Sequence, residues 1–510
     1  MSMILLTKLN EAKLRIQSDD EGVMEELYEF FSFYADGYKF SPLFKQKMWD
    51  GKIRLLNRRN GTLPLGLLDK VCVFATNRKY TIEFSNEFFP RDKFPERHVA
   101  AIKEFIAGLS LTTRGEKIEP RDYQIEAVVH TIMSTRAVCL SPTGSGKSLI
   151  IYILIRWWLK YGYLHDDEKV ILIVPTTALV EQMQKDFIDY SSTDKDFNAA
   201  EETHKIYAGK EKLAIKAPIV ITTWQSAITI KSRSWFEQYG MVICDETHLA
   251  KGKSLVAILD QLTNARYRVG VTGTLDGAMC NELVIQGSFG PIKRVITTKE
   301  LMDADTLAQL SIRLINLKYD PIDCRAAKGM KYDEEIKYLI FHQQRSNFIA
   351  KLAVNQKGNT LVLFNLVEKH GVPLYERIKA MMPEGRNVYY VSGSVDVDDR
   401  ERIRAIVEKE TGAVIVASSG TMSTGVNLRN LHCVIFSAPS KSQIRVLQSI
   451  GRGLRKSDSG QDTILYDIVD DLRLKSNSKP NYALAHGIHR VGIYEKEKFN
   501  MTIHEYKLKL

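Results

Sequence analysis

The stretch Ser141-Pro142-Thr143-Gly144-Ser145-Gly146-Lys147-Ser148 follows an apolar run and leads into a helical pattern. Its two glycines, Gly144 and Gly146, allow a tight turn of the backbone. The N–H groups of this turn and the positive end of the following helix can bind phosphate oxygens. Lys147 would supply a point charge to the phosphates, and Ser148 a hydroxyl ligand for Mg²⁺. The strict pattern begins with Gly where this chain has Ser141. The stretch therefore predicts a nucleotide site on a parallel-sheet lobe.

Apolar strand-like runs alternate with helical patterns from about residue 116, which is typical of parallel sheets covered by helices. The chain contains two such series, so we expect an α/β protein with two similar lobes in tandem. The strands of the first series are Ala137–Ser141, Val170–Val174, Ile219–Thr222, Met241–Asp245 and Tyr267–Thr272. Those of the second are Thr360–Phe364, Asn387–Val391, Ala413–Ala417, Cys433–Phe436 and Thr463–Asp467, with helices such as Asp398–Glu410 between them.

The rest of the chain has a different character. An amphipathic segment at Glu21–Phe33 and a basic hairpin signalled by Asn60-Gly61 predict a small α+β module at the N-terminus. Residues from about Gly290 to Gln343 join the two lobes, and a helical tail follows Ser476. We therefore expect domains at residues 1–105, 114–300, 301–475 and 476–510.

Composition limits the partners and the environment. The 510 residues include 71 Lys and Arg against 61 Asp and Glu, and this net charge of +10 favours a polyanionic partner, although many soluble proteins are mildly basic. The six cysteines are scattered without a C-x-x-C pair, as in a cytosolic protein with reduced thiols. Arg156 interrupts the longest apolar run, Leu149–Leu159, and we expect neither a signal peptide nor a membrane span.

A second chemical motif lies in Val242-Ile243-Cys244-Asp245-Glu246-Thr247-His248. An apolar strand delivers two adjacent carboxylates to its C-terminal end, where open α/β sheets bind ligands. Asp245 would hold Mg²⁺ and Glu246 would polarise an attacking water, with His248 counted among the catalytic candidates. The alternative is a turn with two solvated acids. Because strand, acids and phosphate loop occur in one lobe, we favour the catalytic interpretation.

The segment Pro120-Arg121-Asp122-Tyr123-Gln124 precedes this lobe. A Gln amide can pair with the N6/N7 edge of adenine, and a neighbouring Arg or aromatic side chain can stack on the base. We therefore predict that Gln124 reads adenine, with Arg121 beside it. The alternative is a polar residue that merely starts a helix.

The stretch Gln448-Ser449-Ile450-Gly451-Arg452-Gly453-Leu454-Arg455 offers cations to a phosphate. Arg452 and Arg455 share one face of a predicted helix, and Gln448 lies one turn earlier on it. They lie too far along the chain to belong to the first lobe, so we predict that they complete the nucleotide site from the second. Without the first lobe, a basic surface helix would be the better interpretation.

Taken in order, these motifs resemble those of superfamily 2 helicases of the DExH type. The residues that carry the resemblance are Gln124, Ser141–Ser148, Pro175–Leu179, Thr222–Ser226, Asp245–His248, Thr272–Thr274, Ser423–Asn427 and Gln448–Arg455. Segments outside the lobes resemble the recombination and repair helicases of T-even phages, namely Phe30–Tyr38, Trp49–Leu55, His486–Ile488 and Glu497–Phe499. The resemblance thus covers nearly the whole chain.

The resemblance implies two tandem RecA-like lobes that use ATP and Mg²⁺ and grip one DNA strand by its backbone. Thr272–Thr274 would couple hydrolysis to movement, and Gly425 would face the nucleotide. The residues implied to contact DNA are Pro175, Thr176, Thr223, Gly273 and Thr424. Taken singly, Thr176, Thr223 and Thr424 would be read as capping or strand threonines. Thr424 stands where RNA-directed DEAD-box relatives usually carry Arg, which weakens an RNA-duplex interpretation, whereas Thr247 occupies a variable position.

The implied function is ATP-dependent remodelling of branched DNA: fork regression, Holliday-junction branch migration and R-loop unwinding. The implied partners are branched DNA, single-stranded DNA, RNA–DNA hybrids and replication or recombination proteins, with the chain acting as a monomer in the cytoplasm of a phage host. Two alternatives remain open: a duplex translocase that does not separate strands, and a nucleotide-gated DNA-binding module that does not hydrolyse ATP.

The N-terminal module supplies a further candidate DNA contact. Six cations against a lone Asp50 could form a basic patch interleaved with Phe44 and Trp49. They are Lys45, Lys47, Lys52, Arg54, Arg58 and Arg59, and we name Lys52, Arg54 and Arg58 as the candidate DNA contacts. The alternative is a solvated face over a small aromatic core.

Overall fold

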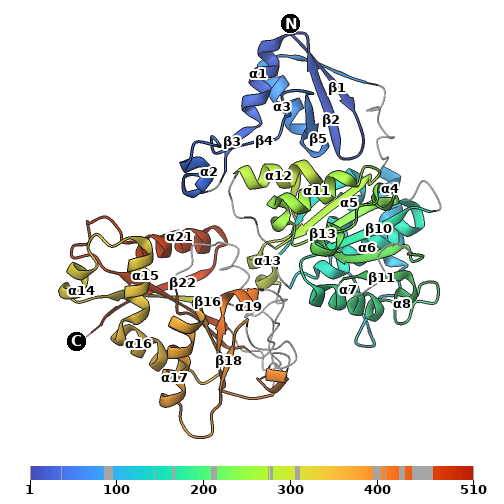
Figure 1. Cartoon of the computed structure of the whole chain (residues 1–510). Helices are drawn as coiled ribbons and strands as arrows, with labels where there is room; N and C mark the ends of the chain where they lie inside the picture. The colour runs from blue at the N-terminus through green and yellow to red at the C-terminus, as the bar shows by residue number, and fades with distance from the viewer. Residues whose placement is uncertain are drawn as a thin grey trace. The chain divides into compact units, whose positions relative to one another are not determined.

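The computed structural model divides the chain into two compact units: residues 1–141 with 146–296, and residues 297–510 with the loop residues 142–145 (Figure 1). No helix in the described part of the chain is both long and apolar enough to cross a membrane. The residues that the structure describes are 2–35, 37–85, 96–142, 144–162, 167–207, 215–273, 275, 279–304, 310–393, 402–403, 405–407, 409–423, 431–438 and 463–508.

The N-terminal module contains a four-stranded sheet in the order β5-β2-β1-β6. Its strands are β1 (Met3–Lys8), β2 (Lys13–Ser18), β5 (Thr62–Pro64) and β6 (Thr81–Phe84), and its main helices are α1 (Glu21–Phe30) and α3 (Leu68–Arg78). Every second residue of β1 and β2 faces the core, so that Ile4, Leu6, Leu14 and Ile16 are fully buried. The predicted small α+β module is therefore confirmed.

The predicted hairpin at Asn60-Gly61 is wrong, although the turn itself is present. Gly61 has a φ of +67° and donates its N–H to the Asn57 carbonyl at 2.9 Å. The strand before the turn, β4 (Lys52–Arg54), pairs with β3 (Ser32–Tyr34), whereas β5 after the turn pairs with β2. Burial of Leu63 in the module core places β5 beside β2, so tertiary packing overrides the local hairpin signal.

Helix α4 (Glu96–Ala107), whose sequence we assigned largely to the N-terminal module, packs with the first parallel sheet. Ile102 and Ile106 are buried in the same core cluster as Val128 and Ile132 of α5 (Asp122–Ser134). The buried residues of the N-terminal module core, in contrast, all precede β6 in the sequence. The structure therefore assigns α4 to the neighbouring lobe.

The first lobe is a seven-stranded parallel sheet in the order β11-β12-β10-β13-β14-β9-β15. Five strands match the predicted series, and two short strands extend the edges. The strands are β9 (Arg136–Leu140), β10 (Lys169–Val174), β11 (Thr203–Ile206), β12 (Ile219–Thr223), β13 (Tyr239–Asp245), β14 (Tyr267–Thr272) and β15 (Ile292–Arg294).

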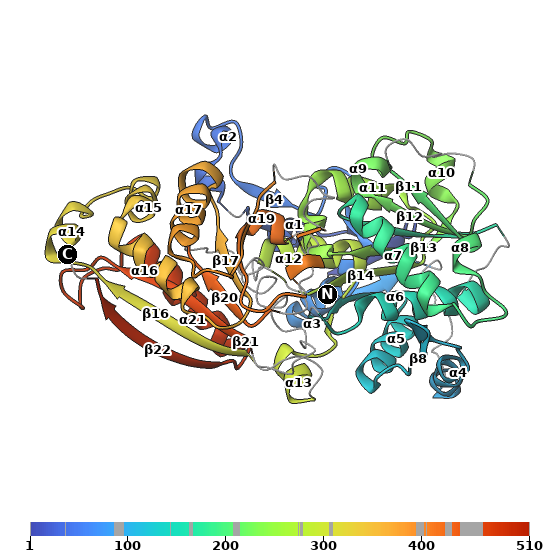
Figure 2. The ribbon, with the colours of Figure 1, turned by 90° about the horizontal axis from the view of Figure 1, so that it is seen from below.

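Helices cover both faces of this sheet (Figure 2). In β10, Val170, Leu172 and Val174 pack with α5, α6 (Lys147–Trp157) and α7 (Thr177–Tyr190). Ile171 and Ile173 point to the other face, which is covered by α9 (Trp224–Ala227), α10 (Arg233–Glu237), α11 (Lys253–Gln261) and α12 (Met279–Phe289). The strands are apolar on both sides because both sides are buried.

The second lobe has a seven-stranded parallel sheet in the order β18-β19-β17-β20-β21-β16-β22. The two sheets confirm the predicted tandem RecA-like lobes. Its strands are β16 (Leu310–Lys318), β17 (Thr360–Phe364), β18 (Val388–Val391), β19 (Val414–Ser418), β20 (Cys433–Phe436), β21 (Thr463–Asp471) and β22 (Asn500–Lys507), and its main helices are α15 (Tyr332–Phe341), α16 (Gln343–Val354), α17 (Val372–Met381) and α21 (Tyr482–Lys496). Most of the predicted helix Asp398–Glu410 lies outside the described residues.

Two segments of the second lobe differ from what the sequence predicts. Strand β16 lies in the stretch that we interpreted as a connection, and it pairs with both β21 and β22. The C-terminal extension is not only helical, because β22 follows α21 and forms the edge of the sheet. Both strands alternate apolar and polar residues, and their pairing partners lie far away in sequence, which local patterns do not reveal.

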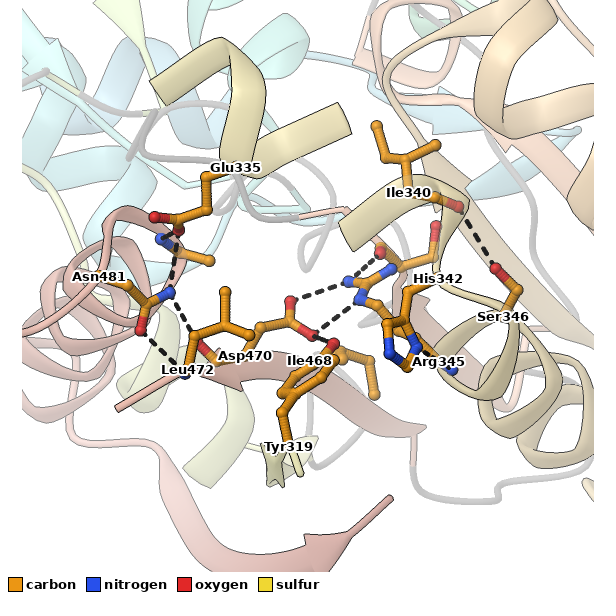
Figure 3. A network of polar contacts seen from close by, with 12 residues as sticks. Tyr319, Glu335, Ile340, His342, Arg345, Ser346, Ile468, Asp470, Leu472 and Asn481 are labelled. Atoms are coloured by element: carbon orange, nitrogen blue, oxygen red, sulfur yellow. Dashed lines mark hydrogen bonds and ion pairs between the residues drawn. The ribbon is translucent and has the colours of Figure 1, made fainter. Parts of the chain in front are cut away.

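Buried ion pairs fix α21 and α16 to the second sheet. Arg345 donates from Nε and Nη2 to the two carboxylate oxygens of Asp470 at 2.7 and 3.0 Å, and Tyr319 donates to Asp470 at 2.7 Å (Figure 3). Arg490 likewise binds both oxygens of Asp467, at 2.8 and 2.7 Å. All four charged side chains are at most 1% exposed. The tail is therefore an integral part of the lobe core.

Candidate nucleotide and nucleic-acid site

The candidate motifs of the first lobe meet at the carboxyl edge of its sheet. Asp245 ends β13, Thr272 ends β14, and the phosphate loop, residues 141–148, follows β9. These three strands are neighbours in the sheet, in the order β13-β14-β9. The backbone N–H of Ser141 donates to the Thr272 carbonyl at 2.8 Å, which joins the loop to the end of β14. This edge is where α/β sheets bind ligands.

The phosphate loop has the geometry of an anion cradle. Gly144 and Gly146 have φ angles of +85° and +77°, in the left-handed region that favours glycine. A Cβ at Gly146 would lie 2.3 Å from the Gln124 Nε2 atom, so a side chain at this position would have to displace the Gln124 amide. Lys147 is the first residue of α6, at its positive end. The residues present therefore fit a nucleotide phosphate.

Gln124 lies against the loop, as its predicted role requires. Its side chain is 4% exposed, and its Oε1 atom accepts the backbone N–H of Arg121 at 2.9 Å. The Arg121 guanidinium donates to the Tyr123 hydroxyl at 3.1 Å on the exposed surface. The structure thus brings Gln124 and Gly146 together, and adenine recognition by Gln124 and Arg121 stays a prediction.

Asp245 is a buried carboxylate, and none of the Lys and Arg side chains that the structure describes lies within ion-pair distance of it. It is 7% exposed and accepts the backbone N–H of Glu246 at 2.9 Å. Burial raises the pKa of Asp245 to about 6, the Glu246 carboxylate acts in the same direction, and the nearby Lys147 cation opposes both. Such a group favours an added cation, as the predicted Mg²⁺ ligand should.

A protein-only cation site is absent from the described part of the chain, where no three His, Cys, Asp or Glu side chains gather around one point. Mg²⁺ commonly takes one or two protein oxygens and completes its shell with phosphate and water. Asp245 and Ser148 fit this pattern.

Glu246, His248 and Thr272 form a chain of contacts. Glu246 has a φ of +49°, which is uncommon for a residue with a side chain and often marks a functional site. Its Oε2 atom lies 3.2 Å from the His248 Nδ1 atom. The same nitrogen lies 3.0 Å from the Thr272 hydroxyl. His248 therefore connects the predicted catalytic carboxylate to the first residue of the predicted coupling motif.

Thr247 has a structural role that its variable position did not suggest. Its hydroxyl lies 2.8 Å from the Cys244 carbonyl and 3.0 Å from the Val271 carbonyl, at the ends of β13 and β14. A Cβ at Gly270 would lie 2.7 Å from the Thr247 methyl group. A glycine inside a strand can signal such a close approach, and Gly270 was the available sequence clue.

Tyr190 contacts the phosphate loop from the end of α7. Its hydroxyl lies 2.8 Å from the Ser148 Oγ atom. Burial raises the pKa of Tyr190 to about 12, so its phenol keeps its proton at neutral pH. No motif in the sequence pointed to this residue.

The residues predicted to grip DNA follow the adjacent strands of the same edge. Thr176, after β10, accepts the Leu179 N–H at 3.3 Å and caps α7. Thr223, at the end of β12, accepts the Ser226 N–H at 3.3 Å and caps α9. Both threonines therefore have the helix-capping role that is the alternative to DNA contact. The Pro175 carbonyl, beside Thr176, accepts the Gln225 amide at 3.3 Å.

The basic patch of the N-terminal module is paired more fully than its sequence suggested. Lys52 lies 2.9 Å from Glu29, and Arg58 lies 2.7 Å from Glu25. Arg54 binds Asp50, and the rings of Tyr34 and Tyr28 lie beside these cations. Asp50 is the only acid within the basic segment itself. Two further acids, Glu25 and Glu29 of α1, pair with its cations in the folded chain.

The remaining predicted residues are Gly273 and a group that lies outside the described residues. Gly273 is described at the end of β14, next to Thr272. The residues that lie outside the described part of the chain are Thr143, Thr274, Thr424, Gly425, Gln448, Arg452 and Arg455. Their predicted roles stay predictions. The thiols of Cys139, Cys244, Cys324 and Cys433 are buried in the lobe cores.

Three family models match the chain. They are "Type III restriction enzyme, res subunit" over residues 117–277, "DNA helicase UvsW, N-terminal" over residues 7–85, and "Helicase conserved C-terminal domain" over residues 343–457. The third matched range includes Gln448, Arg452 and Arg455. The matched ranges follow the three parts of the fold.

The chain is similar along almost its whole length to a characterised protein. It is 37% identical over 498 residues to the ATP-dependent DNA helicase uvsW of Enterobacteria phage T4, covering 95% of this chain and 96% of that protein. It is 24% identical to the DNA 3'-5' translocase XPB2 of Sulfurisphaera tokodaii, over 74% of this chain and 88% of that one. The crystal structure of T4 UvsW matches 99% of this chain and 100% of its own, with a TM-score of 0.52 and 33% identity.

Four observations agree with one another: the order of the motifs, the two RecA-like sheets, the match of the N-terminal module, and the 37% identity to the T4 protein. The chain belongs to the UvsW family of superfamily 2 helicases.

Proposed function

We propose that this chain is an ATP- and Mg²⁺-dependent DNA helicase that remodels branched nucleic acids. The observation that carries the proposal is the convergence of the phosphate loop, Asp245, Glu246 and His248 at one sheet edge, beside the strand ends that bear Thr176 and Thr223. The T4 relative is named an ATP-dependent DNA helicase, and its 37% identity over 95% of this chain supports the same activity here.

The residues of the first lobe would divide the chemistry among them. The loop N–H groups and Lys147 bind phosphate, and Ser148 and Asp245 supply oxygen ligands for the metal. Glu246 orients a water molecule and accepts its proton, while His248 holds the Glu246 carboxylate in place. Bound MgATP supplies the phosphoryl group whose transfer to water releases the free energy for movement.

Residues of the second lobe would complete this site. Arg452 and Arg455 stabilise the negative charge that grows on the transferred phosphoryl group, and Gln448 lies on the same predicted helix face. Their separation in sequence from the phosphate loop supports a site that needs both lobes. Gln124 and Arg121 would select adenine, and Gly425 would contact the nucleotide from the second lobe.

The DNA strand would cross the neighbouring strand ends of the first lobe. Pro175, Thr176, Thr223 and Gly273 offer hydroxyl and backbone groups to phosphates, and Thr424 would add one from the second lobe. These contacts carry no sequence information, as a motor on arbitrary DNA requires. The bond between His248 and Thr272 would link them to Glu246.

The N-terminal module would hold a second part of the branched substrate. A cavity of about 630 Å³ between this module and the first lobe is lined by Arg54, Arg58 and Arg59, which supports contact with a phosphate backbone. In the described structure Lys45, Lys47 and Arg59 have no carboxylate within ion-pair distance, unlike Lys52, Arg54 and Arg58. The unpaired group is free to bind DNA without breaking an internal ion pair.

This part of the proposal is tested by comparing two triple variants in forked-DNA binding across a salt series. Lys52, Arg54 and Arg58 are changed to Gln in one variant, and Lys45, Lys47 and Arg59 in the other. Each lost phosphate contact should make the negative slope of log affinity against log salt shallower by about 0.9. Unchanged affinity and slope in both variants would remove the module from the DNA site.

The substrates we propose are replication forks, Holliday junctions and R-loops, with single-stranded DNA and RNA–DNA hybrids as bound strands. Branch migration replaces one base pair with another, and R-loop exchange is also close to balance. The motor therefore mainly supplies direction. We propose that the chain acts as a monomer in the cytoplasm of the host cell, together with replication and recombination proteins.

The decisive experiment measures ATP hydrolysis and strand displacement on a fork, a static junction and an RNA–DNA hybrid, for the parent chain and Lys147→Ala. We expect DNA-stimulated hydrolysis and displacement by the parent, and loss of both with retained DNA binding in the variant. Hydrolysis without displacement on any substrate would instead indicate a duplex translocase. Binding without hydrolysis would indicate a nucleotide-gated module.

A further inference from the structure

Helix α7 has a predicted functional contact at each end. At its N-terminus, Thr176 caps the helix in the loop proposed to grip DNA. At its C-terminus, Tyr190 is the last helical residue, and its hydroxyl lies 2.8 Å from the Ser148 Oγ atom. The helix has 14 residues and is therefore about 21 Å long. One rigid element thus spans from the proposed DNA contact to the proposed metal ligand.

Aromatic packing fixes the Tyr190 hydroxyl. The Tyr190 ring lies 5.5 Å from the ring of Tyr152, which is 1% exposed and lies on α6 one turn after Ser148. The Tyr152 ring also lies 5.5 Å from that of Phe187, one turn before Tyr190 on α7. Rings of both helices therefore interlock directly behind the Ser148–Tyr190 bond.

The end of α7 is also tied to the chain that precedes the lobe. Thr112 donates its hydroxyl to the Asp189 carbonyl at 2.6 Å, and the Arg114 N–H donates to the Asp189 carboxylate at 2.8 Å. The position of Tyr190 is therefore determined by several contacts, and its hydroxyl can orient a flexible partner.

Ser148 is such a partner. A serine hydroxyl has one proton and two lone pairs and rotates freely unless the proton is held. If Ser148 donates its proton to the Tyr190 oxygen, both of its lone pairs stay available to a metal ion. Partners of metal ligands act in this way, and their loss commonly lowers metal affinity or activity by about 10- to 100-fold.

We propose that Tyr190 is a positioning residue that holds the Ser148 hydroxyl for Mg²⁺, and that α7 couples this contact to DNA bound at Thr176. This inference rests on the proposed function. A shift of the α7 N-terminus when DNA binds is transmitted along the helix to Tyr190 and strains the contacts that hold it, among them its bond to Ser148. By linkage, DNA then changes Mg²⁺-nucleotide affinity, and Mg²⁺-nucleotide changes DNA affinity by the same factor.

The test measures binding of fluorescent mant-ADP to the full chain while MgCl₂ is titrated, with and without single-stranded oligo-dT. We expect Tyr190→Phe to raise the half-saturating Mg²⁺ concentration about 10-fold. Binding of mant-ADP in EDTA should be unchanged, and the shift caused by oligo-dT should be smaller than in the parent. In a Ser148→Ala background, Tyr190→Phe should have no further effect, because its target is missing.

Tyr207→Phe is the matched control. Tyr207 also donates its hydroxyl to a side chain of α7, Glu181, but has no contact with Ser148. This variant should keep the parental Mg²⁺ dependence. Thermal unfolding of both variants in EDTA separates a packing effect from a positioning effect, and we expect the Tyr190→Phe midpoint to stay close to that of the control.

Three results would overturn the inference: an unchanged Mg²⁺ half-saturation in Tyr190→Phe, an equal effect in the Ser148→Ala background, or an equal effect of Tyr207→Phe. Failure of the parent to bind mant-ADP in a Mg²⁺-dependent way would overturn the proposed function as well. Mg²⁺-dependent binding by the parent chain therefore separates a failure of the Tyr190 inference from a failure of the proposed function.

Discussion

Each parallel sheet of this protein buries an acid near the C-terminal end of a strand, and the two acids differ in their partners. In the second lobe, Asp470 binds Arg345 through both carboxylate oxygens and also accepts the Tyr319 hydroxyl (Figure 3). In the first lobe, Asp245 accepts one backbone N–H, and no Lys or Arg of the described structure lies within ion-pair distance of it. Within the described residues, the charge of Asp470 is neutralised by an Arg, whereas that of Asp245 is not.

The difference separates a structural from a functional carboxylate. In a fully paired buried ion pair the attraction offsets the cost of desolvation, and removing one partner leaves the other charge unpaired at high cost. A buried carboxylate without a bound cation destabilises the empty protein and binds an added cation well. Changes around Asp245 should therefore affect catalysis, and changes around Asp470 should affect stability.

The largest expected effect concerns Glu246, beside Asp245. Glu246→Gln keeps the shape of the side chain but removes the base, so ATP turnover should fall about 10³-fold in a steady-state hydrolysis assay with saturating DNA. The thermal unfolding midpoint should be unchanged. Glu104→Gln, which changes an exposed acid on α4, is the control and should hydrolyse ATP like the parent. Turnover within 10-fold of the parent would exclude Glu246 as the base.

Breaking the paired acid should instead reduce stability. Arg345→Met leaves Asp470 buried without its cation and should lower the free energy of unfolding by about 3 to 5 kcal/mol in urea titrations. Adding Asp470→Leu removes the orphaned charge and should restore much of the loss. A single variant as stable as the parent would contradict the structural role of this pair.

Close packing between β13 and β14 predicts a smaller effect. The Cβ of Gly270→Ala would meet the Thr247 side chain at 2.7 and 2.8 Å, so we expect a loss of about 1 to 3 kcal/mol in the free energy of unfolding. Thr247→Ala in the same chain makes room and should reduce the loss. Equal stability of Gly270→Ala and the parent would show that the strand ends are not tightly joined.

A pH dependence is expected in the second lobe, and it is small near neutral pH. Burial lowers the pKa of His370 to about 3, and the nearby Arg345 cation acts in the same direction. Below its ordinary pKa of about 6.5, the unfolded chain binds a proton that the folded chain does not. Stability should therefore fall as pH decreases from about 6.5 toward 3, by up to about 1.4 kcal/mol per pH unit from this group.

His370→Phe should remove that contribution, so its stability should decline less between pH 6.5 and 5 than that of the parent in urea titrations at each pH. Parallel pH profiles for the two proteins would show that His370 does not resist protonation in the folded state.

The comparison also explains what the sequence could predict. Strands β10, β13, β17 and β20 are continuous apolar runs, and the phosphate loop and Asp245-Glu246 directly follow such runs, so local pattern located them. Strand β22 is exposed and polar on most positions, and its place is set by pairing with β16 across the lobe. No local signal contains that information.

Contacts between distant residues were missed for the same reason. Glu25 and Glu29 lie on α1, yet they neutralise Arg58 and Lys52 more than twenty residues away. Tyr190 reaches Ser148 only because α6 and α7 pack side by side. Motifs predict which residues carry chemistry, whereas the partners that orient them depend on the folded chain.

The central claim is tested most directly by the thermal unfolding midpoints of Asp245→Asn and Asp470→Asn, each measured with and without MgADP. We predict that Asp245→Asn keeps or raises the ligand-free midpoint and loses most of the rise caused by MgADP. Asp470→Asn should lower the ligand-free midpoint and keep that rise. A lowered midpoint with a full MgADP response in Asp245→Asn would contradict the functional assignment of the first-lobe acid.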